Sequence, residues 1–204
     1  MTFSSLVACS PFALMWKRFV PLKVKIVVWL VLKERLNTLV MLRNKGIQQN
    51  VTCVLCNSQD EPISHLFLKC PHVISIWSTI RHNLAIGELP VSVNELWTTW
   101  KAASIAHSVR IGWDLSVMEI FWLVWQERNN RIFLNKYQSS LILLGSINSF
   151  ISFWLTNITE KKWRTFARHS GHKGVAGNRA VLVRWSVSSA EPPKQDAVQG
   201  EQKE

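Results

Sequence analysis

Residues 51–71 read VTCVLCNSQDEPISHLFLKCP, and this stretch decides how the chain folds. Cys53, Cys56, His65 and Cys70 follow one another in the spacing Cys-x2-Cys-x8-His-x4-Cys. A Cys-x2-Cys pair in a tight turn directs two thiolates at one point, and a His and a further Cys after a short linker can complete a tetrahedron. The spacing therefore predicts a closed structural Zn²⁺ site, with no corner left for water or a substrate.

Two other interpretations of these residues stay open on spacing alone. His72 could supply the imidazole in place of His65. The cysteines could also be small buried hydrophobic residues that bind no metal. A redox pair of Cys53 and Cys56 is disfavoured, because the thioredoxin-like βαβ setting that such a pair needs is missing from the surrounding sequence.

The apolar periodicity predicts a mainly α fold, built from a small helical zinc-binding module, a further helical region and a flexible basic and polar C-terminal tail. A first helix is expected after Pro21, and a short second one over residues 39–45, with Thr38 as N-cap and Gly46 as its stop. His65 and Cys70 are five residues apart, so one face of a straight helix would not carry both. Cys70 is therefore expected to leave the helix. Pro71 then opens a third helix, which we expect to pack back on Trp29 of the first.

Two more helices are expected downstream. Ser116 and Glu119 have the spacing of a capping box and predict the start of a central apolar helix. Residues 141–163 predict the second, with an inner apolar stripe. Arg128 and Arg131 close the central helix; they could contact phosphates, but we favour a role as the polar end of a buried helix, with Glu127 nearby.

The net charge of +11 is concentrated at two places. Residues 1–50 hold eight Lys or Arg against one acid, and residues 161–185 hold seven and no acid, whereas residues 51–160 are nearly neutral. Such a distribution suits contact with a polyanion, although an ordinary solvated surface would look the same. The candidates for contact with RNA or DNA are Lys17, Arg18, Lys23, Lys25, Arg43 and Lys45.

With its flanks, the cysteine stretch resembles the zinc-binding domain that follows reverse transcriptase in plant non-LTR retrotransposons and in gene fragments derived from them. Leu22 and Asn37 depart from the family, which usually has proline at the first position and often at the second, but neither is a proposed ligand. A pattern of Trp122, Trp125 and Arg128 resembles the segment downstream of that domain. The residues that carry the main resemblance are Trp16-Lys17, residues 20–25, Trp29-Leu30, residues 35–38, Leu42, Gly46-Ile47, Cys53-x2-Cys56, residues 65–67, Cys70-Pro71 and Trp77.

The resemblance implies a place between the polymerase and ribonuclease H regions of a retroelement protein, one bound Zn²⁺ and a role beside the reverse transcriptase machinery. It divides the chain into a ragged N-terminus (1–13), a zinc-binding helical domain (14–85), a helical region (86–163) and a flexible tail (164–204). Within that tail, residues 181–185 faintly resemble the lead-in to ribonuclease H.

Several classes of function are not expected from the sequence. No catalytic constellation is found, so the protein is expected to be non-enzymatic and to have no small-molecule substrate. No run of about 18 apolar residues predicts a membrane span, and no secretory signal is recognised, so we expect an intracellular protein of the nucleus or cytoplasm. The alternative function is that of a domesticated or decaying fragment, acting only as a structural or protein-interaction module.

Overall fold

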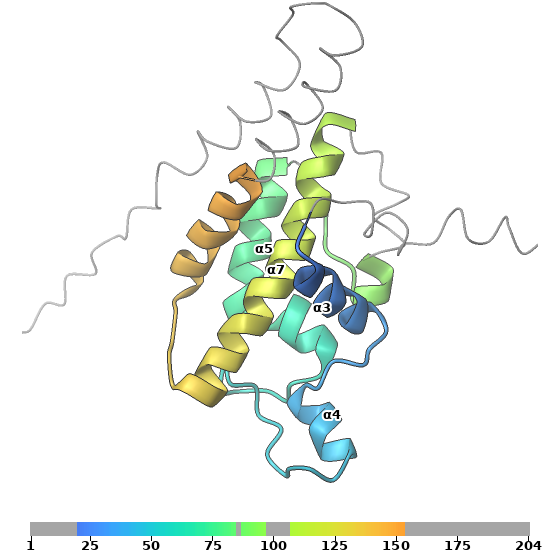
Figure 1. Ribbon diagram of the computed structural model, residues 1–204, viewed down its shortest axis with the longest axis vertical. Coiled ribbons are helices and arrows are strands. Elements are labelled where there is room, and N and C mark those ends of the chain that lie inside the picture. Colours follow the sequence, from blue (N-terminus) through green and yellow to red (C-terminus); the bar gives the residue numbers. More distant parts are fainter. Residues whose placement is uncertain (1–19, 85–86, 97–106, 154–204) are drawn as a thin grey trace, which may run out of the picture.

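Helix α7 (His107–Leu134) runs through the middle of the structure, and α3 (Leu22–Leu32), the π-helical turn η1 (His65–Lys69) and α5 (Pro71–Leu84) pack against it (Figure 1). The computed structural model describes residues 20–84, 87–96 and 107–153. These also include α4 (Leu39–Asn44) and a helix at 140–153. In the described ranges the extended pairing is limited to one antiparallel bridge between Thr52 and Asp60, which confirms the mainly α prediction.

Helix α3 packs on α7 through the predicted apolar stripe. Val24, Val27, Val28 and Val31 are all buried, since residues three and four apart share one face of a helix. On its outer side, the Lys23 ammonium lies 5.0 Å from the centre of the Trp122 ring of α7. The valine stripe thus fixes α3 to the central helix, and Lys23 adds a cation–π contact to the same helix.

Helix α5 follows Pro71 as predicted, but its packing partner differs from the one expected. Trp77 is completely buried, donates a hydrogen bond from Nε1 to the Phe67 carbonyl of η1 at 2.7 Å, and lies 5.8 Å from Trp113 of α7 between ring centres. Trp29 instead keeps 37% of its surface exposed. The prediction that α5 packs on Trp29 is therefore wrong: the valine face of α3 is occupied by α7, and α5 uses η1 and α7.

Helix α7 also begins earlier than predicted. Ser116 lies inside the helix and donates from Oγ to the Gly112 carbonyl, four residues back, at 2.7 Å. It therefore cannot cap a helix start, and the capping-box prediction is wrong, because a Ser-x-x-Glu pattern also occurs within helix interiors. Glu119 is buried rather than exposed on a first turn.

Buried side chains form a continuous core from α3 to the helix at 140–153, including Leu143, Ile147 and Ile151. This helix accounts for the first part of the prediction over 141–163, and residues after 153 lie outside the described part of the chain. The expected ragged N-terminus, the C-terminal tail and the ribonuclease H lead-in lie outside it too. The division at residue 85 stays a prediction.

Helix α4 ends at the predicted stop but begins with a different cap. Gly46 has a φ of +71°, a conformation that glycine adopts at little cost, and the helix ends two residues before it. Thr38 occupies the N-cap position, but its side chain makes no capping bond. The carboxylate of Glu61 accepts the Leu39 N–H instead, at 3.0 Å from 22 residues away, so the start of α4 is tied to the cysteine stretch.

Candidate metal centre

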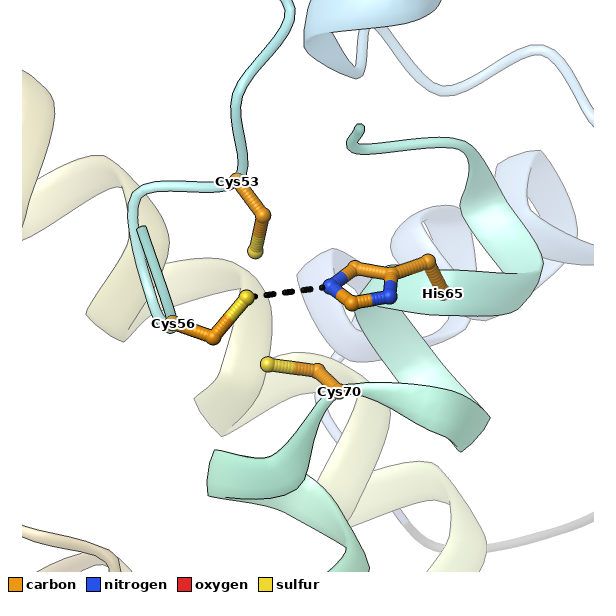
Figure 2. Close-up of side chains that lie close together, drawn as sticks. All are labelled: Cys53, Cys56, His65 and Cys70. Carbon is orange, nitrogen blue, oxygen red and sulfur yellow. Dashed lines mark hydrogen bonds between the residues drawn. The ribbon is translucent and has the colours of Figure 1, made fainter. Parts of the chain in front are cut away.

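The structure brings the four predicted ligands to one point. The sulfurs of Cys53, Cys56 and Cys70 and a ring nitrogen of His65 all lie within 4.8 Å of one another (Figure 2). Cys53, His65 and Cys70 are buried, and Cys56 is half-buried. Four soft or borderline donors thus converge at the edge of the core, and Cys56 is the most exposed of them.

The first two ligands are held by a tight turn. The Cys53 N–H donates to the Gln59 carbonyl at 2.7 Å, and the Cys53 carbonyl accepts the Asn57 N–H at 2.8 Å. Asn57 has a φ of +54°, which asparagine tolerates better than most residues, and this lets the chain reverse directly after Cys56. The bridge between Thr52 and Asp60 closes the base of the turn. Both thiols therefore project from one compact reversal of the backbone.

A π turn places the other two ligands. The Cys70 N–H donates to the His65 carbonyl at 2.7 Å, so the hydrogen bond spans five residues instead of the four of an α-helix. This wider turn lets residues five apart meet on one side, which a straight α-helix would not allow. Cys70 itself is extended, with φ −63° and ψ +129°, and Pro71 begins α5 directly afterwards. The predicted exit of the chain from the helix at Cys70 is confirmed, whereas the π turn was not foreseen.

Hydrogen bonds within the cluster favour the ionised form of Cys53 and Cys56 but the protonated form of Cys70. The Cys70 thiol hydrogen-bonds to the Cys53 sulfur and lowers the pKa of Cys53 to about 6, while the same bond raises the pKa of Cys70. Burial opposes ionisation of Cys56, but hydrogen bonds from Ser58 and His65 outweigh it and lower the pKa of the Cys56 thiol. Because the thiolate is the form that binds a metal, Cys53 and Cys56 are the ligands of the cluster that lose their protons most readily.

The donor set fits Zn²⁺. In a tetrahedral site with metal–sulfur bonds of about 2.3 Å, neighbouring ligand atoms lie about 3.8 Å apart, so the largest separation here needs only about 1 Å of closure. Cys56 Sγ already lies 3.4 Å from His65 Nε2. His72, the alternative histidine, is not in the cluster, and burial together with the nearby Arg131 lowers its pKa. Among the described residues, the imidazole of the cluster is therefore that of His65.

A second layer of polar residues comes from the far end of α7. Arg131 Nη1 donates to the carbonyls of Val54 and Leu55, the two residues between Cys53 and Cys56, at 3.1 and 3.0 Å. The sequence analysis did not predict these contacts. The only sequence signal for them was a glutamate and an arginine four residues apart at the end of an apolar helix.

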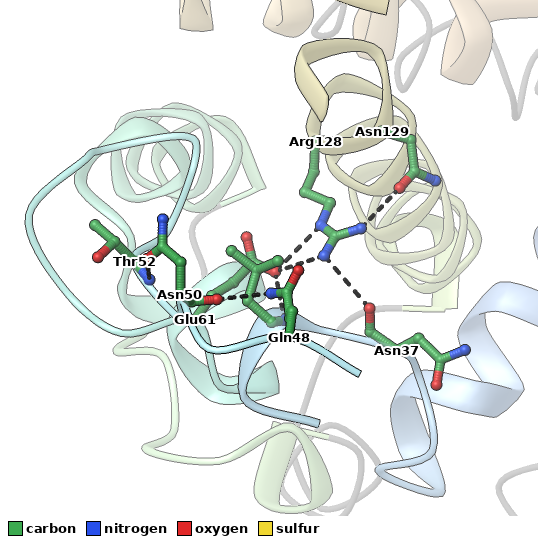
Figure 3. A network of polar contacts seen from close by, with 8 residues as sticks. Asn37, Gln48, Asn50, Thr52, Glu61, Arg128 and Asn129 are labelled. Carbon is green, nitrogen blue, oxygen red and sulfur yellow. Dashed lines mark hydrogen bonds and ion pairs between the residues drawn. The ribbon is translucent and has the colours of Figure 1, made fainter. Parts of the chain in front are cut away.

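The neighbouring Arg128 ties the other end of the cysteine loop to the core (Figure 3). Its Nε and Nη2 both lie 3.1 Å from Glu61 Oε1, and its Nη2 also reaches the Asn37 carbonyl at 3.4 Å. Arg128 is 3% exposed and Glu61 is completely buried. The favoured interpretation of Arg128 and Arg131, as the polar end of a buried helix, is therefore confirmed.

The basic candidates for nucleic-acid contact form two separate pairs in the described structure. Lys23 is exposed and Lys25 half-buried on α3. Arg43 and Lys45 are exposed at the end of α4, which lies at one end of the molecule, away from α3 (Figure 1). Lys17 and Arg18 lie outside the described residues. The two pairs lie on the N-terminal part of the chain, where one acid accompanies eight basic residues.

Comparison with known proteins identifies the N-terminal part of the chain. Residues 1–77 match the family model described as zinc-binding in reverse transcriptase. This segment is therefore a zinc-binding domain of the reverse-transcriptase-associated type, and it contains all four clustered ligands. No curated protein and no solved structure matches the chain. Within the described residues, each helix is too short or too polar to cross a membrane.

Proposed function

We propose that the protein is a non-enzymatic module of the reverse transcriptase machinery of a retroelement, that it holds one structural Zn²⁺, and that it contacts RNA or DNA through basic surface. The observation that carries the proposal is the convergence of Cys53, Cys56, His65 and Cys70 inside a segment matched to a reverse-transcriptase zinc-binding domain. We further expect the protein in the nucleus or cytoplasm, because thiolate ligands persist in reducing compartments.

The metal would act by joining two separate pieces of chain. The turn that carries Cys53 and Cys56 has little regular structure, whereas His65 begins η1 and Cys70 lies between η1 and α5. A structural zinc site contributes apparent binding free energy of about 10 kcal/mol or more to such a unit. With four protein ligands the coordination shell is full, so no position remains for a substrate or an activated water. This supports a structural and non-catalytic role.

Metal content tests the first half of the proposal. The purified chain should carry about one zinc ion, and Cys56→Ala should lose it together with much of the helical circular dichroism signal. Cys9→Ala is the matched control, because Cys9 is the one cysteine outside the Cys-x2-Cys-x8-His-x4-Cys spacing, and this variant should keep both. A Cys56→Ala variant that retains zinc and helicity would show that the site assignment is wrong.

The distribution of charge supports contact with nucleic acid. Arg128 and Arg131 are engaged with carboxylates and backbone carbonyls of the core, so they do not offer charge to a phosphate. The exposed basic residues Lys23, Arg43 and Lys45 remain on α3 and α4. The Lys45 ammonium bonds the Asn37 side chain at 2.7 Å, an exposed contact that a phosphate could replace. Such residues would give affinity for the backbone of a polyanion rather than for a base sequence.

Binding measured at several salt concentrations tests this second half. The affinity for a single-stranded RNA or a duplex DNA should fall linearly in a plot of log K against log salt. Replacing Lys23, Arg43 and Lys45 together by Gln should flatten the slope by up to about 0.9 per lost duplex contact, or about 0.7 for a single strand. Lys136→Gln, on the nearly neutral middle of the chain, should leave the slope unchanged. An equal slope in the triple variant would contradict the assignment of these residues.

The second candidate is a structural or protein-interaction module without affinity for nucleic acid. It is favoured by the apolar side chains at the end of α7 and on the helix at 140–153, where Phe133 is 73% exposed and Leu141 is 65% exposed. Absence of any oligonucleotide binding at low salt, in a protein that still carries its zinc, would favour this candidate over the first.

A further inference from the structure

We infer that Arg131 is a positioning residue for the metal centre, and that helix α7 belongs to the metal-binding unit although it lies beyond residues 1–77. The inference rests on the proposed zinc site and extends it. It assigns to the end of α7 the task of holding the Cys53–Cys56 turn in the shape that the metal requires.

The contacts of Arg131 use all three nitrogens of its guanidinium. Nη1 bridges the carbonyls of Val54 and Leu55, Nη2 donates to the Gln138 carbonyl at 3.0 Å, and Nε donates to Glu127 at 2.6 Å. The carboxylate of Glu127 is completely buried and also accepts the Gln138 N–H at 2.9 Å. These contacts fix the orientation of the guanidinium, so a movement of the Cys53–Cys56 turn would break its hydrogen bonds to Arg131.

The effect on the metal site passes through two planar peptide groups. In each peptide group the carbonyl and the following N–H point in opposite directions. Holding the carbonyls of Val54 and Leu55 therefore aims the N–H groups of Leu55 and Cys56 the other way, and both of these N–H groups hydrogen-bond to Cys53. Arg131 consequently orients the two N–H groups that face the Cys53 sulfur and sets the direction in which Cys56 leaves the turn.

Orientation, rather than charge, is the larger part of this effect. Glu127 lies 2.6 Å from Arg131 and opposes its charge, so the net field at the ligands is smaller than that of Arg131 alone. A lysine would keep the positive charge but could not bridge two carbonyls while bonding a carboxylate and a third carbonyl. Arg131→Lys therefore separates the two contributions.

The experiment compares zinc affinity in two matched arginine variants of the full chain. Arg81 also bonds a backbone carbonyl, that of Gly87 at 2.6 Å, and a carboxylate, that of Glu88 at 2.8 Å, but it does not touch the cysteine turn. Zinc affinity is measured by competition with a chromophoric chelator, and the ligand geometry by the visible spectrum of the Co²⁺-substituted protein. Loss of a residue that orients metal ligands typically weakens binding about 10- to 100-fold. Arg131→Lys should lose about 10-fold or more and alter the Co²⁺ spectrum, and Arg81→Lys should change neither.

A purely structural role for Arg131 predicts a different pattern. It would lower the unfolding midpoint of the zinc-loaded protein but leave the Co²⁺ spectrum unchanged and the zinc affinity within about twofold of wild type. That result would overturn the inference. If Arg131→Lys does not fold, the zinc affinity of Glu127→Gln is measured instead. This variant leaves Arg131 in place but weakens its orientation, and a zinc affinity within about twofold of wild type would again overturn the inference. Failure of both variants to fold in saturating zinc would also overturn it. Absence of zinc from the wild-type protein would instead refute the proposed function.

Discussion

The buried pair of Glu61 and Arg128 should be the most sensitive polar contact outside the metal site. Glu61→Gln keeps the size of the side chain and one oxygen that can accept the Leu39 N–H, but it leaves the Arg128 guanidinium buried without a counter-charge. Breaking one side of a buried ion pair costs about 3–5 kcal/mol. Glu61→Ala should cost about 1 kcal/mol more, because it also removes the cap of α4.

Urea unfolding of the zinc-loaded protein, followed by circular dichroism, measures these losses as changes in the free energy of unfolding. The control is Glu88→Gln, because Glu88 is 90% exposed in its pair with Arg81 and such pairs contribute about 0–1 kcal/mol. A typical domain has only about 5–15 kcal/mol in total, so the difference between the two glutamates is easy to resolve.

The double variant Glu61→Gln with Arg128→Met completes a cycle that isolates the interaction. Because it removes both charges, it should be less destabilised than the sum of the two single variants by about 2 kcal/mol or more. A Glu61→Gln protein within about 1 kcal/mol of wild type, or single losses that simply add, would refute the reasoning that these charges depend on each other.

Three further predictions concern the backbone, the protons and the core. At neither Gly46 nor Gly112 would an added Cβ meet a neighbour within 4 Å, so the backbone decides the effect of alanine. Gly46→Ala should destabilise the protein by about 1 kcal/mol because alanine is strained at a φ of +71°, whereas Gly112→Ala should stabilise it by up to about 1 kcal/mol because alanine favours the helix. Thermal unfolding of the two variants should show shifts of opposite sign. Zinc binding at pH 7 should release fewer than three protons, because the pKa of Cys53 is lowered to about 6 and this thiol is mostly ionised at pH 7. Acidification through pH 6 should raise the number of protons released, which calorimetry in buffers of different ionisation enthalpy measures. Release of three protons at pH 7 would contradict the hydrogen bond between the Cys53 and Cys70 thiols. Trp77→Phe should cost about 2 kcal/mol in denaturant unfolding, through the lost bond to the Phe67 carbonyl and the space left behind, and a loss below 0.5 kcal/mol would show that this bond contributes little.

The sequence predicted those parts of the molecule that depend on local spacing. The Cys-x2-Cys turn, the valine stripe of α3 and the stop of α4 at Gly46 each follow from a few neighbouring residues, and the structure contains all three. The break of the helix at Cys70 also followed from counting residues. Such features need no knowledge of the rest of the fold.

The features that were missed depend on residues far apart in the chain. Glu61 caps α4 from a distance of 22 residues, and Arg131 reaches the Val54 carbonyl across 77. The mistaken helix start at Ser116 has the same origin, because burial of α7 against other elements outweighs a local capping pattern. Periodicity shows that a helix has an apolar face, but it does not show which other helix covers that face.

The π turn between His65 and Cys70 limits how this segment can vary in length. One residue more or fewer there would break the five-residue hydrogen bond between the Cys70 N–H and the His65 carbonyl and carry the Cys70 sulfur away from the other ligands. Residues 57–60 are exposed but also belong to the site, because the Asn57 N–H and the Gln59 carbonyl hydrogen-bond to Cys53 and Asp60 pairs with Thr52. Related chains that keep the site should therefore preserve the spacing from His65 to Cys70 to the residue.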